Sequence, residues 1–387
     1  MRSSIAADFV STVRHVVGDA AQVPLHIPDI GDAEKAFVAD CLDSTFVSSV
    51  GPYVNRFESE IADYTGSRHA IAVSNGTSAL QVALVLAGVE HGDEVIVPAL
   101  SFVATANAVS HAGGHPFFVD SDPATMGMDV SALEYALRSF RREGTEIINP
   151  RSGRRVAAVI PMHTLGHPVD ISALVALAES FGIPVVEDAA ESLGSFIAGR
   201  HTGTFGRLGI LSFNGNKIVT TGGGGMILTQ DDEIARRAKH LTTTAKVAHA
   251  WEFDHDEIAW NYRMPNLNAA MGVAQLTKLE QFLVNKRELA RRYAEAFATV
   301  PAFTFMTEPE GTSSNYWLCA VKLEAPSIEL RNEVLQAATS DGLQCRPFWN
   351  LLNELRMYQS CDSGDLSAAR ALRDGVICLP SSPGILD

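Results

Sequence analysis

Residues Ile210–Met226 read I-L-S-F-N-G-N-K-I-V-T-T-G-G-G-G-M, and the interpretation of the whole chain depends on them. A short apolar strand is expected over residues 210–213, followed by Lys217 and then by a run of glycines. A lysine between a core strand and a glycine turn lies near apolar groups, which disfavour its charged form and leave a free amine that can condense with a carbonyl. For Lys217 taken alone, a surface lysine in a turn is the simpler interpretation. The rest of the chain has to decide between the two.

Short apolar segments alternate with helical patterns on both sides of this stretch. The expected strands are apolar on both faces, which is typical of a mainly parallel sheet covered by helices on both sides. Expected strands cover residues 70–74, 94–99, 116–120, 156–162, 184–188, 210–213 and 225–229, and expected helices cover residues 54–64, 77–87, 104–111, 131–140, 171–181, 232–241 and 267–297. The sequence therefore predicts an α/β fold.

The two ends of the chain have a different texture. Residues 1–50 read as a polar, loosely patterned arm. Beyond residue 301 the expected elements become shorter, with a strand over residues 320–323 and a helix over residues 328–340. We expect a large domain over residues 1–265, which includes the arm, and a small C-terminal α+β domain over residues 266–387.

The composition restricts the partners and the location. Lys and Arg number 30 and Asp and Glu number 45, which gives a net charge of −15. No basic run is present, so we expect neither nucleic acid nor an anionic membrane as a partner. No apolar run is long enough to span a bilayer, and residues 1–26 lack a signal-peptide core, which predicts a cytoplasmic protein. The 5 cysteines have no paired short spacing, so we expect free thiols and no metal site.

The residues that follow the strands are the candidates for ligand binding, because open α/β sheets bind ligands beyond the carboxyl ends of their strands. The segment N-G-T-S at residues 75–78 opens a helix, and its backbone N–H groups, its glycine and its two hydroxyls can hold a phosphate. A plain helix cap explains the segment equally well. Phe102, directly after the second strand, could cover a flat ring or could belong to the core.

Asp188 ends a buried apolar strand, where a carboxylate is costly unless a cation pairs with it. A protonated pyridine nitrogen would supply that cation, and the carboxylate would keep the ring an electron sink. A cap for the following turn is the alternative, which the alanines at positions 189 and 190 make weaker. The glycines at 222–225 open no helix and form no G-x-G-x-x-G loop, so a dehydrogenase is disfavoured. Phosphate cradle, aromatic residue, carboxylate and lysine together describe a pyridoxal phosphate (PLP) site.

The same residues lie in segments that resemble the DegT/DnrJ/StrS sugar aminotransferases, a family of fold-type I PLP enzymes. The matching segments are G-P at 51–52 with F-E at 57–58, S-N-G-T-S-A-L at 74–80, G-D-E-V-I-V-P at 92–98, F-V-A-T at 102–105, E-D-A-A at 187–190, S-F at 212–213, T-G-G-G-G-M at 221–226 and N-Y-R-M at 261–264. The resemblance covers nearly the whole chain. It implies PLP as the cofactor and Lys217 as the residue that carries it.

The resemblance also implies roles for individual residues. Asp188 would pair with the pyridine nitrogen, Phe102 would stack on the ring, and Glu191 would face the cofactor's O3′, where most of the family has Gln or His. The implied phosphate ligands are Gly76, Thr77, Ser78 and Ser212. Asn261 would reach the phosphate in the neighbouring subunit, which implies a homodimer with shared active sites.

Within the family, the chain most resembles the branch that aminates C4 of nucleotide-linked 4-keto-6-deoxy-N-acetylhexosamines, in pathways of the legionaminic acid or bacillosamine type. The segments that carry this likeness are V-S-S-V-G at 47–51, P-M-H at 161–163, E-D-A-A-E-S at 187–192, S-F-N-G-N-K at 212–217, S-N-Y-W at 314–317 and R-P-F-W at 346–349. The likeness implies glutamate as the amino donor, a UDP-linked 4-amino sugar as the product, and sugar contacts from Ser49, His163 and Arg346. A-W at 259–260, where the branch more often has G-Y, departs from the pattern.

Other functions stay open at this point. A GDP-linked sugar or a C3-keto sugar would suit the same chemistry. A catalytically silent relative that binds a nucleotide sugar as a regulator is disfavoured by the intact Lys217 and Asp188. A sugar dehydratase of the same fold is disfavoured because those relatives have histidine in place of the lysine, and an NAD-dependent enzyme would need the missing glycine fingerprint.

Overall fold

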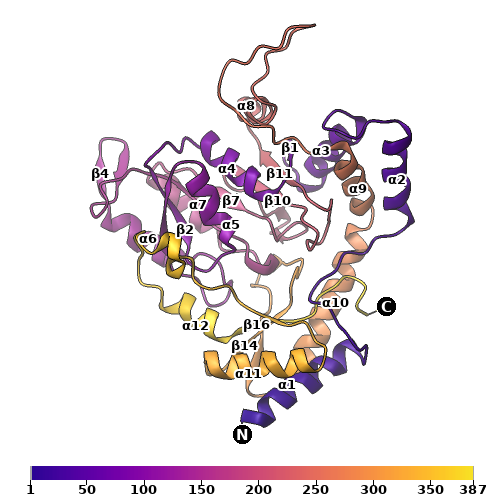
Figure 1. Ribbon diagram of the computed structural model, residues 1–387. Helices are drawn as coiled ribbons and strands as arrows, with labels where there is room; N and C mark the ends of the chain where they lie inside the picture. Colours follow the sequence, from indigo (N-terminus) through magenta and orange to yellow (C-terminus); the bar gives the residue numbers. More distant parts are fainter. Residues whose placement is uncertain (1, 387) are drawn as a thin grey trace.

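The larger sheet of the computed structural model, which describes residues 2–386, has the strand order β3-β2-β6-β7-β10-β11-β1 (Figure 1). Bridges from Val159 to Val185 and from Met162 to Asp188 join its two hydrogen-bonded halves. Its strands are β1 His69–Val73, β2 Glu94–Pro98, β3 His115–Val119, β6 Val156–Val159, β7 Val186–Asp188, β10 Leu208–Ser212 and β11 Gly225–Thr229. Neighbouring strands are parallel except for β11, which is antiparallel to β10 and to β1. The prediction of a mainly parallel sheet is confirmed.

Helices cover both faces of this sheet, because successive side chains of a strand point to opposite faces and both sets are apolar here. In β1, Ile71 and Val73 pack on one face, while Ala70 and Ala72 pack on the other. The helices on the first face are α4 Gly76–Leu86, α5 Val103–His111 and α8 Asp232–Thr242, and those on the second are α3 Pro52–Thr65, α6 Val130–Ser139, α7 Ile171–Ser180 and α9 Asn266–Leu276.

Side-chain caps set the starts of several of these helices. The Asn75 side chain accepts a hydrogen bond from the backbone N–H of Ser78 at 2.8 Å, and Asp129, Asp170 and Asp231 cap α6, α7 and α8 in the same way. Helix α4 therefore begins at the carboxyl end of β1, with its first N–H groups directed towards the ligand-binding edge of the sheet.

The small domain contains an antiparallel sheet in the order β12-β14-β16-β15. Its elements are α10 Leu279–Phe297, β12 Phe303–Phe305, β14 Ala320–Leu323, α11 Ile328–Ser340, β15 Arg346–Pro347, α12 Ser367–Gly375 and β16 Val376–Cys378. Helix α1 (Arg2–Val17) completes this domain, because Phe9 and Val13 share a core with Tyr293 and Phe297 of α10. The N-terminal residues are therefore not simply an arm, since their apolar side chains recur at helical spacing.

The expected boundary at residue 265 stays a prediction. Helix α2 (Asp32–Asp43) packs on α9, and α9 packs on α3 beside the large sheet. Phe282 at the start of α10 also belongs to the core of the large domain, whereas Leu289 and Tyr293 belong to the core of the small one. The small domain thus takes its core residues from both ends of the chain.

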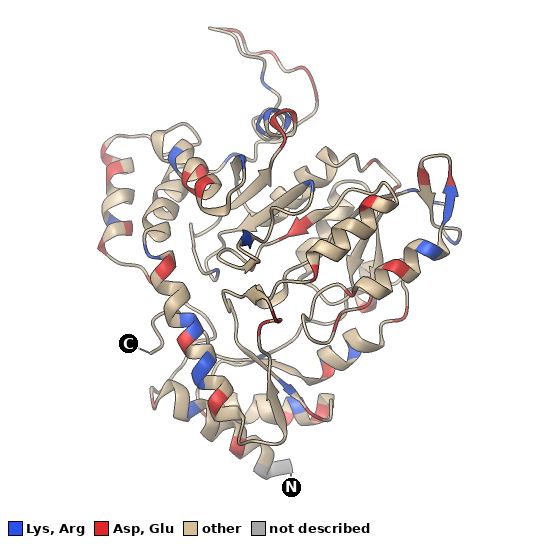
Figure 2. Ribbon diagram, turned by 180° about the vertical axis from the view of Figure 1, so that it is seen from behind, with Lys and Arg blue, Asp and Glu red and all other residues tan. Residues whose placement is uncertain are grey.

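Short elements complete the fold. They are the hairpin of β4 Arg141–Glu143 and β5 Glu146–Ile148, the strands β8 Phe196–Ile197, β9 Arg200–His201 and β13 Thr312–Ser313, and the 3-10 turns η1 Thr164–Gly166, η2 Leu352–Glu354 and η3 Arg356–Tyr358. Basic and acidic residues are interspersed along the outer helices (Figure 2). Within residues 2–386, no helix combines the length and the apolar character needed to cross a lipid bilayer.

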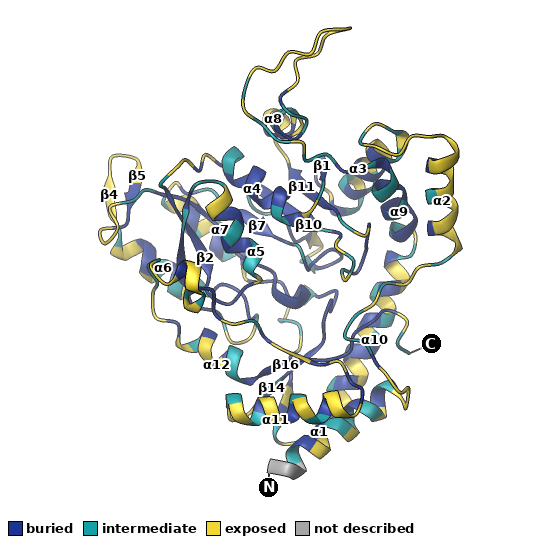
Figure 3. Ribbon diagram, in the orientation of Figure 1, coloured by how far each residue is buried: buried dark blue, intermediate teal, exposed yellow. Residues whose placement is uncertain are grey.

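Residues 244–260 project beyond α8, away from the rest of the molecule (Figure 1). Most of this segment is exposed (Figure 3). The exposed fraction is 78% for Trp251, 79% for Phe253 and 95% for Ile258. Large apolar side chains gathered in water are typical of a surface that a partner covers.

Candidate active site

A cavity of about 980 Å³ lies at the carboxyl ends of the parallel strands, between the large sheet and the small domain. The predicted site residues that line it are Gly76, Thr77, Phe102, Asp188, Glu191, Ser212, Lys217 and Arg346. The other predicted residues, Ser49, Ser78, His163 and Asn261, do not line it. Residues from both domains contribute to its wall, as do residues 24–27 from the segment between α1 and α2.

Lys217 follows β10 and directs its amine into this cavity. Its Nζ lies 3.3 Å from Oε1 of Glu191 and 3.9 Å from the ring centroid of Trp317. The indole N–H of Trp317 donates to the carbonyl of Asn216 at 2.7 Å, so the ring is fixed beside the lysine. The side chain of Lys217 is 12% exposed. The amine is thus held between a carboxylate and an aromatic face, which are two environments that attract an ammonium.

Glu191 is held for this pairing by an unusual turn. Its Oε2 accepts a hydrogen bond from the N–H of Leu165 at 2.9 Å, and Leu165 has a positive φ of 57°. Gly166 follows with φ 94°, and a Cβ there would lie 1.8 Å from Oδ1 of Asn315. Only glycine fits that position, so the turn that presents the Leu165 N–H depends on it. Burial raises the pKa of the Glu191 carboxyl, and the charge of Lys217 opposes the rise.

Asp188 lies buried at the end of β7. Its Oδ2 accepts from the Thr105 hydroxyl at 2.8 Å, and its Oδ1 accepts from the N–H of Ala190 at 3.2 Å. Burial raises the pKa of the Asp188 carboxyl. Within the described residues no cationic side chain forms an ion pair with it. A buried carboxylate that lines a cavity without an ionic partner fits the protonated nitrogen of a pyridine ring.

The cradle at the start of α4 fits a phosphate group. A Cβ at Gly76 would lie 3.0 Å from Cβ of Ser212, and a Cβ at Gly225 would lie 2.5 Å from the backbone carbon of Asn75. These glycines therefore let the end of β10 and β11 approach the first turn of the helix. Ser78 does not line the cavity, and its hydroxyl accepts from that of Ser74 at 3.5 Å. Of the predicted phosphate ligands, Gly76, Thr77 and Ser212 are the ones that the cavity reaches.

His163 is fully buried beside Asp188 but lies outside the cavity. Its Nε2 lies 3.0 Å from Oε2 of Glu187, and its Nδ1 accepts from the N–H of Val169 at 3.3 Å. Both ring nitrogens are therefore occupied. The backbone N–H of His163 also donates to the Asp188 carbonyl at 3.1 Å, so the histidine helps to fix the strand end that carries Asp188. A sugar contact by His163 stays a prediction.

Ser49 and Asn261 lie away from the cavity of their own chain. Ser49 belongs to a loop that is tied to α9, because the N–H of Asn266 donates to the Ser48 carbonyl at 2.6 Å. Asn261 is exposed and forms an isolated bridge with Thr243 at the base of the projecting segment. Their roles in binding sugar and phosphate stay predictions, which concern a neighbouring subunit in the case of Asn261.

Three cavity or supporting residues had no role in the sequence-based site. Thr105 holds Asp188, Trp317 covers Lys217, and His26 lines the cavity from the N-terminal segment. Thr105 and Trp317 lie within the family-like segments F-V-A-T and S-N-Y-W, which was a usable signal. For His26 the sequence contains no such signal, because nothing in the pattern of residues 24–27 indicates that they lie near the carboxyl ends of the strands.

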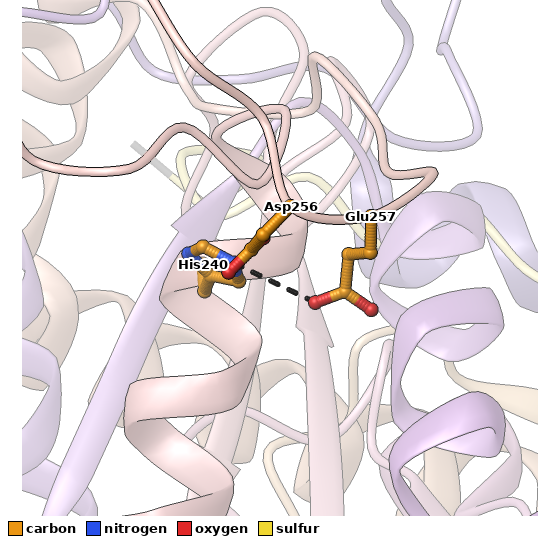
Figure 4. Close-up of side chains that lie close together, drawn as sticks. All are labelled: His240, Asp256 and Glu257. Atoms are coloured by element: carbon orange, nitrogen blue, oxygen red, sulfur yellow. Dashed lines mark hydrogen bonds and ion pairs between the residues drawn. The ribbon is translucent and has the colours of Figure 1, made fainter.

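A separate cluster of His240, Asp256 and Glu257 lies at the base of the projecting segment (Figure 4). Nε2 of His240 is 2.7 Å from Oδ1 of Asp256 and 3.5 Å from Oε1 of Glu257. Arg237 pairs with both oxygens of Glu257, and this hydrogen bonding lowers the pKa of the Glu257 carboxyl. Because Arg237 already neutralises one carboxylate, the cluster fits an ion-pair clasp between the segment and α8 better than a cation site.

The sheet order, the buried carboxylate and the lysine beyond β10 define a PLP-dependent transferase of fold type I. When bound, PLP supplies an aldehyde that condenses with amines and a ring that accepts electrons. A solved structure of the aminotransferase TlmJ from Streptoalloteichus hindustanus superposes on this chain with a TM-score of 0.84, at 30% identity and with 93% of each chain covered.

Sequence comparisons identify the family. The model of the DegT/DnrJ/EryC1/StrS aminotransferase family matches residues 28–387, and the chain belongs to this family. It is 35% identical over 372 residues to the "Putative pyridoxal phosphate-dependent aminotransferase EpsN" of Bacillus subtilis (strain 168), which covers 95% of this chain and 92% of EpsN. It is 36% identical over 336 residues to GDP-perosamine synthase of Escherichia coli O157:H7, which covers 87% of each. The protein is a PLP-dependent sugar aminotransferase.

Proposed function

We propose that this enzyme transfers the amino group of glutamate to C4 of a nucleotide-linked 4-keto-6-deoxy-N-acetylhexosamine and forms a UDP-linked 4-amino sugar. The observation that carries the proposal is the extent of the cavity, which includes both Lys217 and Arg346. Its volume of about 980 Å³ lies near the upper end of the range for small-molecule sites. It has room for a sugar and part of a charged nucleotide in addition to the cofactor.

The walls of the cavity suit such a substrate. The ring centroids of Phe102 and Trp349 are 6.3 Å apart, and Trp349 stacks on Phe348 with an interplanar angle of 2°. Flat aromatic faces pack well against sugar carbons or a base. Arg346 is exposed and donates to the carbonyl of Cys345, and it forms no ion pair within residues 2–386. Its guanidinium is therefore available to phosphate oxygens of a diphosphate linkage.

The side chains near the cofactor divide the tasks of the proposed reaction among them. Lys217 would hold the cofactor, and its amine, once free, would move a proton between C4′ of the cofactor and the substrate carbon. Trp317 and Glu191 keep that amine within reach, at 3.9 Å and 3.3 Å. Asp188 would keep a proton on the pyridine nitrogen, and the Thr105 hydroxyl keeps the carboxylate oriented.

The test offers the PLP-loaded protein glutamate and a panel of keto-sugars: a UDP-linked 4-keto-6-deoxy-N-acetylhexosamine, a GDP-linked 4-keto-6-deoxyhexose and a C3-keto sugar. Mass spectrometry and NMR identify the product and the carbon that carries the new amine. We expect C4 amination of the UDP-linked sugar, with formation of 2-oxoglutarate and with no product from a Lys217→Ala control. A protein that aminates none of these sugars would contradict the proposal.

A GDP-linked 4-keto sugar is the second candidate substrate. It is favoured by the 36% identity to a protein named GDP-perosamine synthase. The UDP-linked substrate is supported by the branch-like segments, including R-P-F-W at residues 346–349. The panel separates the two, because a clear preference for the GDP-linked sugar would replace the UDP-linked substrate and leave the C4 chemistry unchanged.

We also propose that the enzyme acts as a homodimer with shared active sites. The exposed Trp251 and Phe253 of the projecting segment support this, as do Phe46 and Val50, which are 50% and 69% exposed beside Ser49. In such a dimer Asn261 and Ser49 would serve the cavity of the partner subunit.

A further inference from the structure

Residues 24–27 form a strap that crosses from α1 towards α2 and lines one side of the cavity. Hydrogen bonds fix the strap to the end of the small domain. The carbonyl of Leu25 accepts from the N–H of Ser381 at 2.6 Å, and the N–H of Ile27 donates to the hydroxyl of Ser382 at 3.0 Å. The backbone is therefore held on both sides of the one residue between them.

That residue, His26, has no hydrogen-bond partner for its ring. Both imidazole nitrogens are buried, and neither meets a donor or an acceptor within the described part of the chain. Leaving buried polar atoms unpaired costs stability, so native proteins rarely keep them without a reason. Because His26 lines the cavity and its backbone is fixed, a ligand in the cavity is the candidate partner for its ring nitrogens.

Burial favours the uncharged form of the His26 ring. Burial lowers the pKa of His26 well below its usual value, and the positive charges of Lys286 and Lys217 lower it further. A neutral imidazole offers one N–H donor and one nitrogen acceptor. Its complement is a ligand group that can both donate and accept, such as a hydroxyl or a secondary amide.

We propose that His26 is a positioning residue for the sugar substrate, and that its ring nitrogens bind a hydroxyl or the N-acetyl group of the keto-sugar. This inference rests on the proposed function and adds a specificity contact to it. Lys217 lines the same cavity. A sugar held by His26 from the strap would therefore keep its keto carbon in place for the amine transfer.

The amino donor fits His26 less well. Glutamate presents carboxylates, which only accept hydrogen bonds and gain most from a cation. Arg346 lines the same cavity and supplies a permanent cation, whereas His26 is held neutral. His26 is therefore expected to act with the sugar and not with glutamate, and the two half-reactions of an aminotransferase allow this to be measured.

The test compares wild type with His26→Leu, which removes both nitrogens, and with His26→Asn, which keeps one donor and one acceptor. Conversion of the PLP-loaded protein by glutamate is followed by its visible absorbance without any sugar. Reaction of the resulting aminated protein with the UDP-linked keto-sugar is followed separately. For His26→Leu we expect the KM for the sugar to rise about tenfold and the glutamate half-reaction to change by less than about twofold. His26→Asn should recover part of the loss.

Thermal unfolding distinguishes positioning from a structural role. Leucine removes unpaired buried polar atoms, so the Tm of the sugar-free protein should stay the same or rise. A structural role would lower the Tm and weaken both half-reactions alike, and that result would overturn the inference. His167→Leu is the matched control, because both nitrogens of His167 are also buried and unpaired but His167 does not line the cavity. It should leave the KM for the sugar unchanged.

An unchanged KM for the sugar in His26→Leu would also overturn the inference. A wild-type protein that aminates no nucleotide-linked keto-sugar would overturn the proposed function and this inference together. If wild type aminates the sugar and the His26 variants have the same KM for it, the role of His26 is overturned and the proposed function stands.

Discussion

Replacement of Lys286 by methionine should change how the stability of this protein depends on pH. Lys286 is 1% exposed, and its Nζ donates to the carbonyls of Tyr316, Trp317 and Ser381 at 3.3, 3.0 and 2.6 Å. No carboxylate forms an ion pair with it within residues 2–386. Burial lowers the pKa of Lys286 from its usual 10.5 to about 7.

The sign and the size of the effect follow from this shift. The unfolded chain keeps the proton up to pH 10.5 and the folded protein releases it near pH 7, so the unfolded state binds more protons in between. Below pH 7 both states keep the proton, so the buried charge lowers the free energy of unfolding by its full amount. Above pH 7 the free energy of unfolding rises with pH by up to about 1.4 kcal/mol per pH unit. Between about pH 7 and about pH 9 the gain is about 2 kcal/mol. Methionine has no proton to release, so the variant lacks this gain.

Thermal unfolding of PLP-loaded protein, at one protein concentration, measures the difference. The Tm of wild type relative to Lys286→Met should increase by about 2 to 3 °C between about pH 7 and about pH 9. Lys35→Met is the control, because Lys35 pairs with Asp32 at the surface. The difference between its Tm and that of wild type should stay the same between about pH 7 and about pH 9. Parallel pH curves for wild type and Lys286→Met would refute the reasoning.

Three further predictions concern the site. Borohydride reduction of the PLP-loaded protein should attach the cofactor to Lys217, and peptide mass spectrometry that finds it on another residue would contradict the assignment. Asp188→Asn should keep the Tm but lower kcat by about 10²-fold, because an amide cannot hold a proton on the pyridine nitrogen. Near-normal turnover would argue against that role. Lys217→Ala subunits mixed with Asn261→Asp subunits should regain about a quarter of wild-type activity, because heterodimers then contain one intact site. Exchanged dimers without activity would place each site within one chain.

The positions at which the parallel strands end could be predicted from the sequence, because strands that are buried on both faces consist of continuous apolar runs. Asp188 and Lys217 each follow such a run, and the structure places both at one cavity. Chain order alone was enough here, since the carboxyl ends of parallel strands meet at the same edge of a sheet.

The partners of these residues could not be predicted in the same way. His163 also lies beyond a strand, but it pairs with Glu187, whose side chain points away from that of Asp188 because neighbouring residues alternate along a strand. Trp317 and His26 come from opposite ends of the chain and meet the cavity only through the packing of the small domain. No local sequence pattern indicates that these two residues line the same cavity.

The packing of α1 against α10 has a consequence for how the protein is made. Helix α1 leaves the ribosome well before α10, the helix that it packs on, which begins only at Leu279. At a translation rate of roughly 5–20 residues per second, the apolar face of α1 stays without this partner for on the order of tens of seconds. All strands of the large sheet, up to β11, are synthesised in this interval and can pair without it. We therefore expect α1 to dock on α10 last, after the strands of the large sheet have paired.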